Sequence, residues 1–346
     1  MNLDIFQGKR ILITGGSGFI GGCLIRRLIN QTKAKIFNLD KLGYASDLLA
    51  IKHNKESNQY SLIKCDLSNY DETKVAIKKT NPDLIFHLAA ESHVDKSIEN
   101  PFVFLQSNII GTFNLLEISR DHYEKLSNER RKDFRFLHIS TDEVFGSLGK
   151  EGSFSEASQY DPRSPYSATK ASSDHLVNAW YHTYGLPVIK TNCSNNYGPW
   201  QFPEKLIPLA ISKAIKGETI PIYGDGSNIR DWLYVEDHIN GLILAIQKGN
   251  IGKSYCIGGF GEKSNLEIVE NICSVLNEIN PKEKKYQDLI KFVKDRPGHD
   301  QRYSIDSSFI QNKLGWSPKT NLSDGIRETV IWYVNNQDWC FKDRIS

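Results

Sequence analysis

Short apolar runs alternate with longer amphipathic stretches through the first half of the chain. The apolar runs predict buried strands, and the amphipathic stretches predict helices between them. The expected strands are 10–14, 35–39, 60–64, 84–87, 134–139 and 187–191, and the expected helices are 18–31, 101–123 and 166–184. This alternation predicts the α/β class, with a Rossmann-like doubly wound parallel sheet that has helices on both faces.

The alternation weakens beyond Cys193, which indicates a change in architecture. Asn, Gly and Pro are frequent in 195–203, so we expect a loop there. The later expected elements are a helix at 207–216, a strand and helix within 231–247, a strand at 254–257, and helices at 266–279 and 322–335. We therefore predict a sheet domain made of 1–194 plus 229–257, and a smaller, discontinuous C-terminal substrate-binding lobe made of 195–228 plus 258–346. A lobe beyond the carboxyl ends of the strands would close a ligand cleft.

Composition narrows the possible partners. The 346 residues include 43 Lys plus Arg and 41 Asp plus Glu, a balance that argues against nucleic acid as a partner. The six cysteines show neither metal-site spacing nor a disulfide framework, so we expect reduced thiols, no metal and a cytoplasmic protein. We predict no signal peptide and no association with a membrane, because no apolar run approaches the roughly 20 residues that span a bilayer.

A glycine-rich segment, TGGSGFIG at 14–21, joins the first expected strand to the first expected helix. Its glycines permit a tight turn, and the N–H groups at the helix start can receive a dinucleotide's diphosphate. The spacing fits both GxGxxG from Gly16 and GxxGxxG from Gly15, and geometry does not choose between them. Asp40 follows Gly21 by 19 residues, at the end of the second strand. A carboxylate there can bond both ribose hydroxyls and would repel a 2′-phosphate, so the segment predicts NAD rather than NADP.

The YxxxK spacing occurs at Tyr60/Lys64, Tyr70/Lys74 and Tyr166/Lys170. On a helix it places a phenol and an ammonium on one face. The cation is expected to lower the pKa of the phenol and make it a usable base. The first pair lies on an expected strand and the second in an exposed, charged stretch. Only Tyr166 follows a strand on the cofactor side, so we expect a functional role for this pair alone.

Thr141, Asp142 and Glu143 follow the fifth expected strand, at the ligand end of the sheet. Two adjacent carboxyl groups there would be costly to desolvate. One role for them is a proton donor beside a proton acceptor, with pKa values pushed apart by their environments. The other is a helix N-cap, for which Thr and Asp are well suited. Position alone leaves both roles open.

Seven segments together resemble the extended short-chain dehydrogenase/reductase family, and more closely its dehydratases of nucleotide-activated hexoses. They are TGGSGFIG at 14–21, HLAAESHVD at 87–95, STDEVFG at 140–146, SPYSATKASSDHL at 164–176, NCSNNYGPWQFPEKLIP at 192–208, IRDWLYVEDH at 229–238 and DRPGHDQRY at 295–303. The resemblance spans essentially the whole chain. The TDE, SNNYGP and DRPGHD stretches are specific for the subgroup, whereas many relatives share the glycine turn and YxxxK.

The resemblance implies a dehydration in which bound NAD is reduced and reoxidised in every turnover. Tyr166 would take the O4 proton while hydride leaves C4, with Thr141 holding O4 and Lys170 holding the cofactor ribose. Glu143 would remove the C5 proton and Asp142 would protonate O6, so that water leaves and C6 accepts the hydride. The implied substrate is a nucleotide-diphosphate hexose, with dTDP-glucose favoured. Thymine and uracil differ by one methyl group, worth about 1–3 kcal/mol, so the choice between dTDP and UDP stays open.

The resemblance also implies where the two ligands would bind. The residues expected at NAD are Gly15, Gly18, Phe19, Ile20, Gly21, Asp40, Lys41, Asp66, Leu67, Leu88, Ala90, Ser107, Tyr166, Lys170 and Asn196. The residues expected at the nucleotide sugar are Ser92, Thr141, Asn195, Lys205, Leu206, Pro221, Tyr223, Arg230, Asn265, Arg296 and His299. Helices 101–123 and 166–184 are expected to form the contact of a homodimer.

Four other functions compete with this interpretation. A sugar-nucleotide 4-epimerase shares the fold, NAD, Tyr and Lys but does not need the two carboxyl groups. A UDP-glucuronate decarboxylase or GDP-mannose dehydratase shares much of the cleft, although DRPGHD favours the hexose dehydratase. A protein that senses NAD without turnover is the alternative from a different class, and it would not need Thr141, Tyr166 and Lys170.

Overall fold

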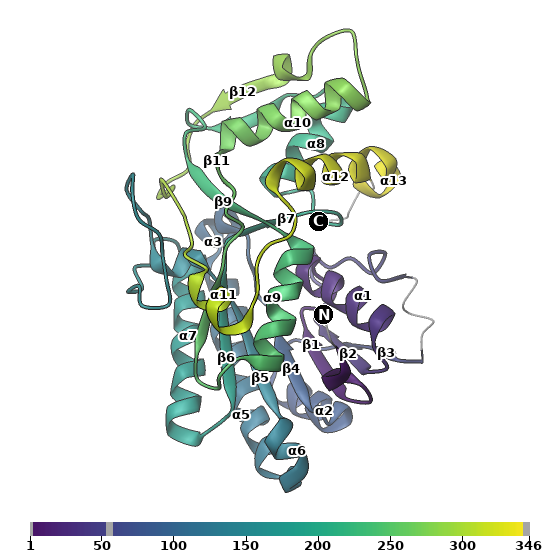
Figure 1. Ribbon diagram of the computed structural model, residues 1–346, viewed down its shortest axis with the longest axis vertical. Helices are drawn as coiled ribbons and strands as arrows, with labels where there is room; N and C mark the ends of the chain where they lie inside the picture. Colours follow the sequence, from purple (N-terminus) through teal and green to yellow (C-terminus); the bar gives the residue numbers. More distant parts are fainter. Residues whose placement is uncertain (1–2, 53–57, 342–346) are drawn as a thin grey trace.

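Seven parallel strands form the central sheet of the computed structural model, which describes residues 3–52 and 58–341. Their order is β10-β6-β5-β4-β1-β2-β3 (Figure 1). The strands are β1 (Arg10–Thr14), β2 (Lys35–Asp40), β3 (Tyr60–Lys64), β4 (Leu84–His87), β5 (Arg135–Thr141), β6 (Val188–Cys193) and β10 (Ser254–Ile257). The order reverses beside β1, so the crevice at the carboxyl ends of β1 and β4 is the expected ligand position. The predicted fold class is confirmed.

Helices cover both faces of the sheet because successive strand residues point in opposite directions. On β1, Ile11 and Ile13 pack in one apolar cluster and Leu12 packs in another. The first face carries α1 (Phe19–Gln31), α9 (Val235–Lys248) and α11 (Ser308–Leu314). The second carries α2 (Tyr70–Thr80), α5 (Gly111–Glu124) and α7 (Pro165–Tyr184). The sheet is therefore buried on both sides, as its nearly continuous apolar strands predict.

Local signals fix the bounds of the helix that bears the Tyr-Lys pair. The Ser164 side chain accepts from the N–H of Ser167, and Pro165 occupies the first helical position of α7. The helix ends where Gly185 adopts φ 69°, a left-handed conformation that suits glycine. The two ends make α7 a rigid element of 20 residues that starts beside the carboxyl end of β5.

The helix expected at 101–123 is interrupted in the structure. It consists of α4 (Pro101–Phe104), the π-helical segment η3 (Leu105–Ile110) and α5. Within η3, the side chain of Asn108 bonds both the N–H and the carbonyl oxygen of Glu91, and donates to the Thr169 hydroxyl. A π-turn adds one residue to the helical turn and often marks a functional site. Here it ties the helix to the segment after β4 and to α7.

A second lobe lies above the carboxyl ends of the sheet, at the top of Figure 1. It contains a three-stranded sheet ordered β11-β9-β7 and a two-stranded sheet of β12 and β8. The strands are β7 (Asn195–Tyr197), β8 (Ile220–Tyr223), β9 (Ile229–Tyr234), β11 (Glu262–Ser264) and β12 (Ile290–Val293), and the helices are α8 (Leu206–Lys216), α10 (Asn265–Ile279), α12 (Leu322–Asn335) and α13 (Gln337–Cys340). The expected loop at 195–203 is wrong for its first three residues, because β7 pairs in parallel with β9.

The remaining elements are η1 (Asp4–Phe6), α3 (Val94–Glu99), α6 (Asn128–Asp133), η4 (Asp142–Phe145) and η5 (Tyr286–Leu289). The segment 229–257 connects the two parts of the molecule: β9 pairs in the three-stranded sheet, whereas α9 packs against α1 and the central sheet. The predicted domain division at these residues stays a prediction. No helix among residues 3–52 and 58–341 is long and apolar enough to cross a membrane.

Candidate active site

The glycine turn between β1 and α1 packs tightly against the rest of the sheet. Gly15 has φ 69°, and a Cβ there would lie 2.7 Å from the backbone of Ala89. A Cβ on Gly16 would collide with the Asn38 side chain on β2. Gly15, Gly18 and Gly21 line a cavity of about 320 Å³, whereas Gly16 faces the sheet. The structure therefore assigns the cavity side of the turn to the GxxGxxG spacing.

Asp40 ends β2 at the edge of the same cavity. One carboxylate oxygen accepts from the N–H of Ser17 at 2.9 Å, and the other accepts from the N–H of Leu42 and the hydroxyl of Ser46, both at 2.8 Å. Three donors leave part of the carboxylate's acceptor capacity unused, since it offers about four lone-pair sites. Asp40 thus orders its own loop and keeps room for another hydroxyl donor.

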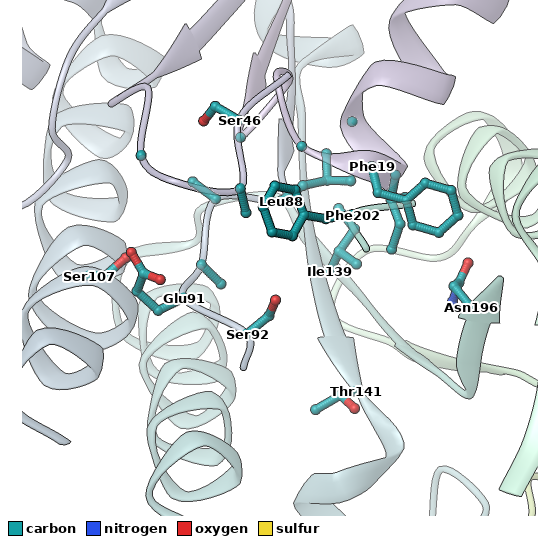
Figure 2. A pocket seen from close by; sticks show the side chains of 18 of the residues that line it. Phe19, Ser46, Leu88, Glu91, Ser92, Ser107, Ile139, Thr141, Asn196 and Phe202 are labelled. Carbon is teal, nitrogen blue, oxygen red and sulfur yellow. The ribbon is translucent and has the colours of Figure 1, made fainter. Parts of the chain in front are cut away.

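All fifteen residues expected at NAD line this cavity. Figure 2 shows Phe19, Leu88, Ser107 and Asn196 around it, although they come from α1, the segment after β4, η3 and β7 of the second lobe. Sequence reasoning missed Tyr44, Ser46, Glu91, Phe202 and Glu204, which also line the cavity. Glu91 forms an ion pair with Lys41, and its place in the short segment that follows β4 was the signal that could have identified it.

Thr141, Asp142 and Glu143 enter the cavity from the end of β5. The Thr141 hydroxyl accepts from the N–H of Glu143 at 3.3 Å and so caps the 3-10 turn η4. It also donates to Asp142 Oδ1 at 3.2 Å. The capping role left open by the sequence is thus present. Both carboxyl groups nevertheless face a ligand-sized cavity, which capping does not require.

The environments of the two carboxyl groups differ. Asp142 is 1% exposed, and its Oδ2 has no hydrogen-bond partner among the described residues. Burial, followed by the negative charges of Glu143 and Asp231, raises the pKa of Asp142 well above its usual value. Burial also raises the pKa of Glu143, but there the charges of Arg296, Lys205 and Arg230 oppose it. Asp142 is therefore suited to hold a proton and donate it. Glu143 is suited to be a carboxylate that accepts a proton.

Tyr166 and Lys170 lie one turn apart on α7, and both line the cavity. Lys170 donates from Nζ to the carbonyl oxygen of Ile139 at 2.8 Å, and burial lowers the pKa of its ammonium. Burial and the charge of Glu143 raise the pKa of Tyr166 well above its usual value. The expected lowering of this pKa is wrong in this structure, because desolvation and a nearby carboxylate dominate, and Lys170 is not among the groups that lower it.

The other two YxxxK pairs lie away from the cavity, as expected. Tyr60 accepts a hydrogen bond from Asn38 within the sheet at 2.9 Å, and Lys74 lies over the ring of Tyr70 at the start of α2. Neither pair is among the cavity residues. Position relative to the sheet, rather than the YxxxK spacing, therefore selects the pair that can take part in chemistry at the cavity.

The eleven residues expected at the nucleotide sugar divide into two groups. Ser92, Thr141, Asn195 and Lys205 line the cavity, and Lys205 donates to the Ser92 carbonyl oxygen at 2.8 Å. The second group lies beyond the cavity on the second lobe and is called the outer residues here: Leu206, Pro221, Tyr223, Arg230, Asn265, Arg296 and His299. Their role at the nucleotide sugar stays a prediction.

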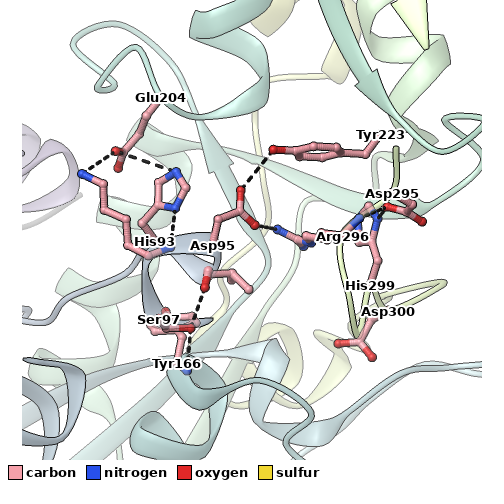
Figure 3. A network of polar contacts seen from close by, with 12 residues as sticks. His93, Asp95, Ser97, Tyr166, Glu204, Tyr223, Asp295, Arg296, His299 and Asp300 are labelled. Carbon is pink, nitrogen blue, oxygen red and sulfur yellow. Dashed lines mark hydrogen bonds and ion pairs between the residues drawn. The ribbon is translucent and has the colours of Figure 1, made fainter. Parts of the chain in front are cut away.

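Several outer residues are held by contacts within the protein. Arg230 on β9 donates to the carbonyl oxygens of Ile229 and Asp300, at 2.8 and 2.9 Å. His299 Nδ1 lies 2.7 Å from a carboxylate oxygen of Asp295, as Figure 3 shows. Asn265 begins α10, and its N–H donates to the Asn228 carbonyl oxygen at 3.0 Å. Among residues 3–52 and 58–341, no cluster of three His, Cys, Asp or Glu side chains is arranged to hold a metal ion.

Comparison with known proteins supplies the family. A family model described as GDP-mannose 4,6 dehydratase matches residues 12–329. A dTDP-glucose 4,6-dehydratase of Shigella flexneri is 50% identical over 339 residues, covering 95% of this chain and 94% of that protein. One of Haemophilus influenzae is 51% identical over 331 residues, covering 94% and 98%.

Solved structures give the same result. The dTDP-glucose 4,6-dehydratase of Streptomyces venezuelae, crystallised with NAD, has a TM-score of 0.87 at 38% identity and covers 95% of this chain and 98% of that one. A UDP-glucuronic acid 4-epimerase of Bacillus cereus has a similar fold, with a TM-score of 0.82, but only 28% identity over 94% and 99% of the chains. The family resemblance inferred from the motifs is thus confirmed, and the chain belongs to the dTDP-glucose 4,6-dehydratase family within the extended short-chain dehydrogenases/reductases.

Proposed function

We propose that this protein is a hydro-lyase that converts dTDP-glucose to dTDP-4-keto-6-deoxyglucose and water, with NAD as a recycled cofactor. The observation that supports it most directly is the pairing of the buried Asp142 with the half-buried Glu143, which share one cavity with Tyr166 and Lys170. The relatives of this chain at about 50% identity are dTDP-glucose 4,6-dehydratases, and related structures from Streptomyces venezuelae and Bacillus anthracis contain NAD.

The cavity fits NAD in its donors and acceptors. No side chain caps α1, so the first N–H groups of that helix have no side-chain acceptor and lie beside the cavity-lining Gly18. A Cβ on Gly18 would meet only the Gly15 carbonyl oxygen, at 3.3 Å, which leaves open space on its cavity side. We infer that this turn would hold the diphosphate, Asp40 a ribose, and Lys170 the ribose near the reacting carbon. When bound, NAD would accept hydride from C4 of the hexose and return it at C6.

Tyr166 is the proposed base for the proton of O4. Thr141 is placed to assist, because its side chain lowers the Tyr166 pKa and so partly opposes the effect of burial. Its one hydroxyl hydrogen, which goes to Asp142 here, would turn to the phenolate during this step. Asn108 and Ser97 hold the start of α7, through the Thr169 hydroxyl and the Tyr166 N–H respectively. The phenol is therefore attached to a rigid helix start, as a general base requires.

The two carboxyl groups explain the loss of water. Oxidation at C4 acidifies the C5 proton, and Glu143 would remove it as a carboxylate supported by Arg296, Lys205 and Arg230. Asp142, whose pKa burial raises further, would deliver a proton to O6 so that it leaves as water. The proton taken at C5 and the proton given to O6 keep the step balanced.

The same pair argues against two of the alternatives, the 4-epimerase and the protein that only senses NAD. A 4-epimerase returns hydride to C4 and has no proton to deliver at O6, so it would not need a buried acid beside a base. A protein that only senses NAD would not need a reactive phenol and two desolvated carboxyl groups, which are costly to maintain.

Arg230 and Arg296 lie near the cleft, and their guanidinium groups suit the diphosphate of the substrate.

We further propose a homodimer formed by α4, η3 and α5 together with α7. Phe102 is 61% exposed, and Leu105, Ile110, Phe113 and Tyr184 are also exposed large apolar side chains on these elements. These elements contact one another, and exposed apolar side chains on neighbouring helices favour an interface. Sedimentation at micromolar concentration should give twice the mass of the chain, and a monomer there would contradict the proposal.

We also propose that the protein is cytoplasmic, since all six cysteines are free thiols.

Turnover tests the proposed function directly. Purified protein should convert dTDP-glucose to a keto sugar without added oxidant or reductant, and UDP- and GDP-glucose assayed in parallel would define the nucleotide. Stoichiometric release of NADH would contradict a recycled cofactor. Formation of a C4 epimer in place of the keto sugar would instead identify the rival activity.

A further inference from the structure

Asp95 connects the two lobes across the outer part of the cleft. It lies in the first turn of α3, and its carboxylate points toward the second lobe (Figure 3). One oxygen lies 3.3 Å from Nη1 of Arg296, and the other accepts from the Tyr223 hydroxyl at 3.3 Å. Both partners are outer residues expected at the diphosphate of the nucleotide sugar. A single carboxylate therefore contacts two side chains that are expected to bind another anion.

A carboxylate and a diphosphate satisfy a guanidinium in the same way, through oxygen acceptors placed against its N–H groups. Arg296 uses Nη1 for Asp95, and its buried Nε has no hydrogen-bond partner among the described residues. The fork is thus only partly satisfied. We propose that Asp95 is an internal anion that occupies Arg296 and Tyr223, and that the nucleotide diphosphate must displace it in order to bind, so that Asp95 lowers the affinity for substrate. This inference rests on the proposed function.

The geometry favours displacement over assistance. Both contacts are long for charged hydrogen bonds, and the Arg296 and Asp95 side chains are 23% and 30% exposed. A pair of this kind contributes little stability and is readily exchanged. Had Asp95 served mainly to orient Arg296 for the ligand, a shorter contact engaging Nε as well would be expected.

The backbone holds Asp95 in place as a competitor. Two residues later, the buried Ser97 hydroxyl donates to the Val94 carbonyl oxygen at 2.6 Å and accepts from the Tyr166 N–H at 3.2 Å. The first bond lies within α3, and the second fixes α3 to the start of α7. The Asp95 carboxylate therefore cannot leave with its helix and must give up its partners by side-chain rotation.

The test is the affinity of the full, NAD-saturated protein for dTDP, measured by calorimetry. Asp95→Asn should lower the Kd for dTDP about two- to fivefold, the range expected when a partly exposed ion pair no longer competes. Binding of thymidine, which has no phosphate, should not change. Glu99→Gln is the matched control, because it removes the same charge from the exposed end of the same helix and should leave the Kd for dTDP unchanged.

An unchanged or higher Kd in Asp95→Asn, with normal thermal unfolding, would overturn the inference, since Asp95 would then be neutral or helpful to binding. Asp95→Ser provides a second charge-removing variant if the first does not fold. Wild-type protein that binds dTDP normally while the variants gain nothing would overturn this inference alone. Wild-type protein that neither binds dTDP nor converts dTDP-glucose would overturn the proposed function itself, and the inference with it.

Discussion

Two groups of candidate residues in this molecule are positioned by different means. The strand-end group comprises Thr141, Asp142, Glu143, Tyr166 and Lys170, which end or follow β5 or lie in the first two turns of α7, and which share one cavity. The outer residues come from separate pieces of the second lobe and lie beyond that cavity. Sheet topology brings the first group together, whereas side-chain contacts such as Arg296–Asp95 and His299–Asp295 hold the second.

The difference separates chemistry from affinity. Burial dominates the pKa values of Asp142, Glu143 and Tyr166, and desolvation is what makes such groups effective acids and bases. Arg296 and Tyr223 are partly exposed, so their contacts are expected to exchange more easily. Substitutions in the strand-end group should therefore act on kcat, and substitutions among the outer residues should act on KM.

Glu143→Gln gives the largest expected effect. An amide cannot accept the C5 proton, so turnover should fall about 10²- to 10⁴-fold, the usual contribution of a general base. Exchange of the C5 hydrogen with deuterated solvent, followed by mass spectrometry, should fall with it. Glu151→Gln removes the charge of an exposed side chain in the loop after β5, and it should leave both turnover and exchange unchanged. Exchange at the wild-type rate in Glu143→Gln would remove this residue from the proposed role.

The strand-end group was predictable because few physical rules determine its place. Strands β1, β3 and β4 have the predicted bounds, and a parallel sheet brings the carboxyl ends of its strands to one edge. Once Asp40, Thr141 and Tyr166 were assigned to that edge, their common cavity followed. The pKa of Tyr166 was not predictable, because the depth of burial and the nearby Glu143 are tertiary features.

Other features left no readable signal. The π-helical turn at Leu105–Ile110 depends on contacts of Asn108 with two other elements, and no residue type specifies it. Strand β7 has only three residues and exists because it pairs with β9. The Arg296–Asp95 pair joins positions 201 residues apart, so only the assembled fold could place it.

Arg230 and Arg296 are both expected at the diphosphate, but the first is buried and the second is partly exposed. Lysine keeps the charge but loses the planar fork, so Arg296→Lys should raise KM for dTDP-glucose about 10- to 100-fold with kcat nearly unchanged, the loss expected for a charged hydrogen bond. Arg230→Lys should raise KM similarly and also lower Tm. Arg230 is only 4% exposed, bonds two carbonyl oxygens and lies 4.4 Å from the centre of the Tyr303 ring.

Steady-state kinetics and thermal unfolding of the same preparations would measure both quantities. Arg327→Lys is the control, since Arg327 forms an exposed pair with Glu278 on the second lobe. Equal losses of Tm in Arg230→Lys and Arg296→Lys would contradict the distinction between a structural cation and an exchangeable one. A fall in kcat without a change in KM would move Arg296 into the strand-end group.

An effect on stability rather than on turnover is expected at acidic pH beneath the strand-end group. His138 on β5 lies 3.0 Å from Asp174 on α7, and both side chains are fully buried. Burial, with the charge of Lys170, lowers the pKa of His138 from 6.5 to about 4. Between these values the unfolded chain binds a proton that the folded protein does not, so stability must fall as pH falls from 6.5 to about 4, by up to about 1.4 kcal/mol per pH unit. The lowered pKa of Asp174 adds no loss of stability until the pH falls toward the pKa of an unfolded aspartate.

Urea unfolding measures this dependence. The free energy of unfolding of His138→Gln should decline less steeply over this pH window than that of the wild type, whatever its stability at neutral pH. His175→Gln, an exposed substitution on α7, should keep the wild-type slope. An unchanged slope in His138→Gln would mean that the acid response originates elsewhere than under the strand-end group.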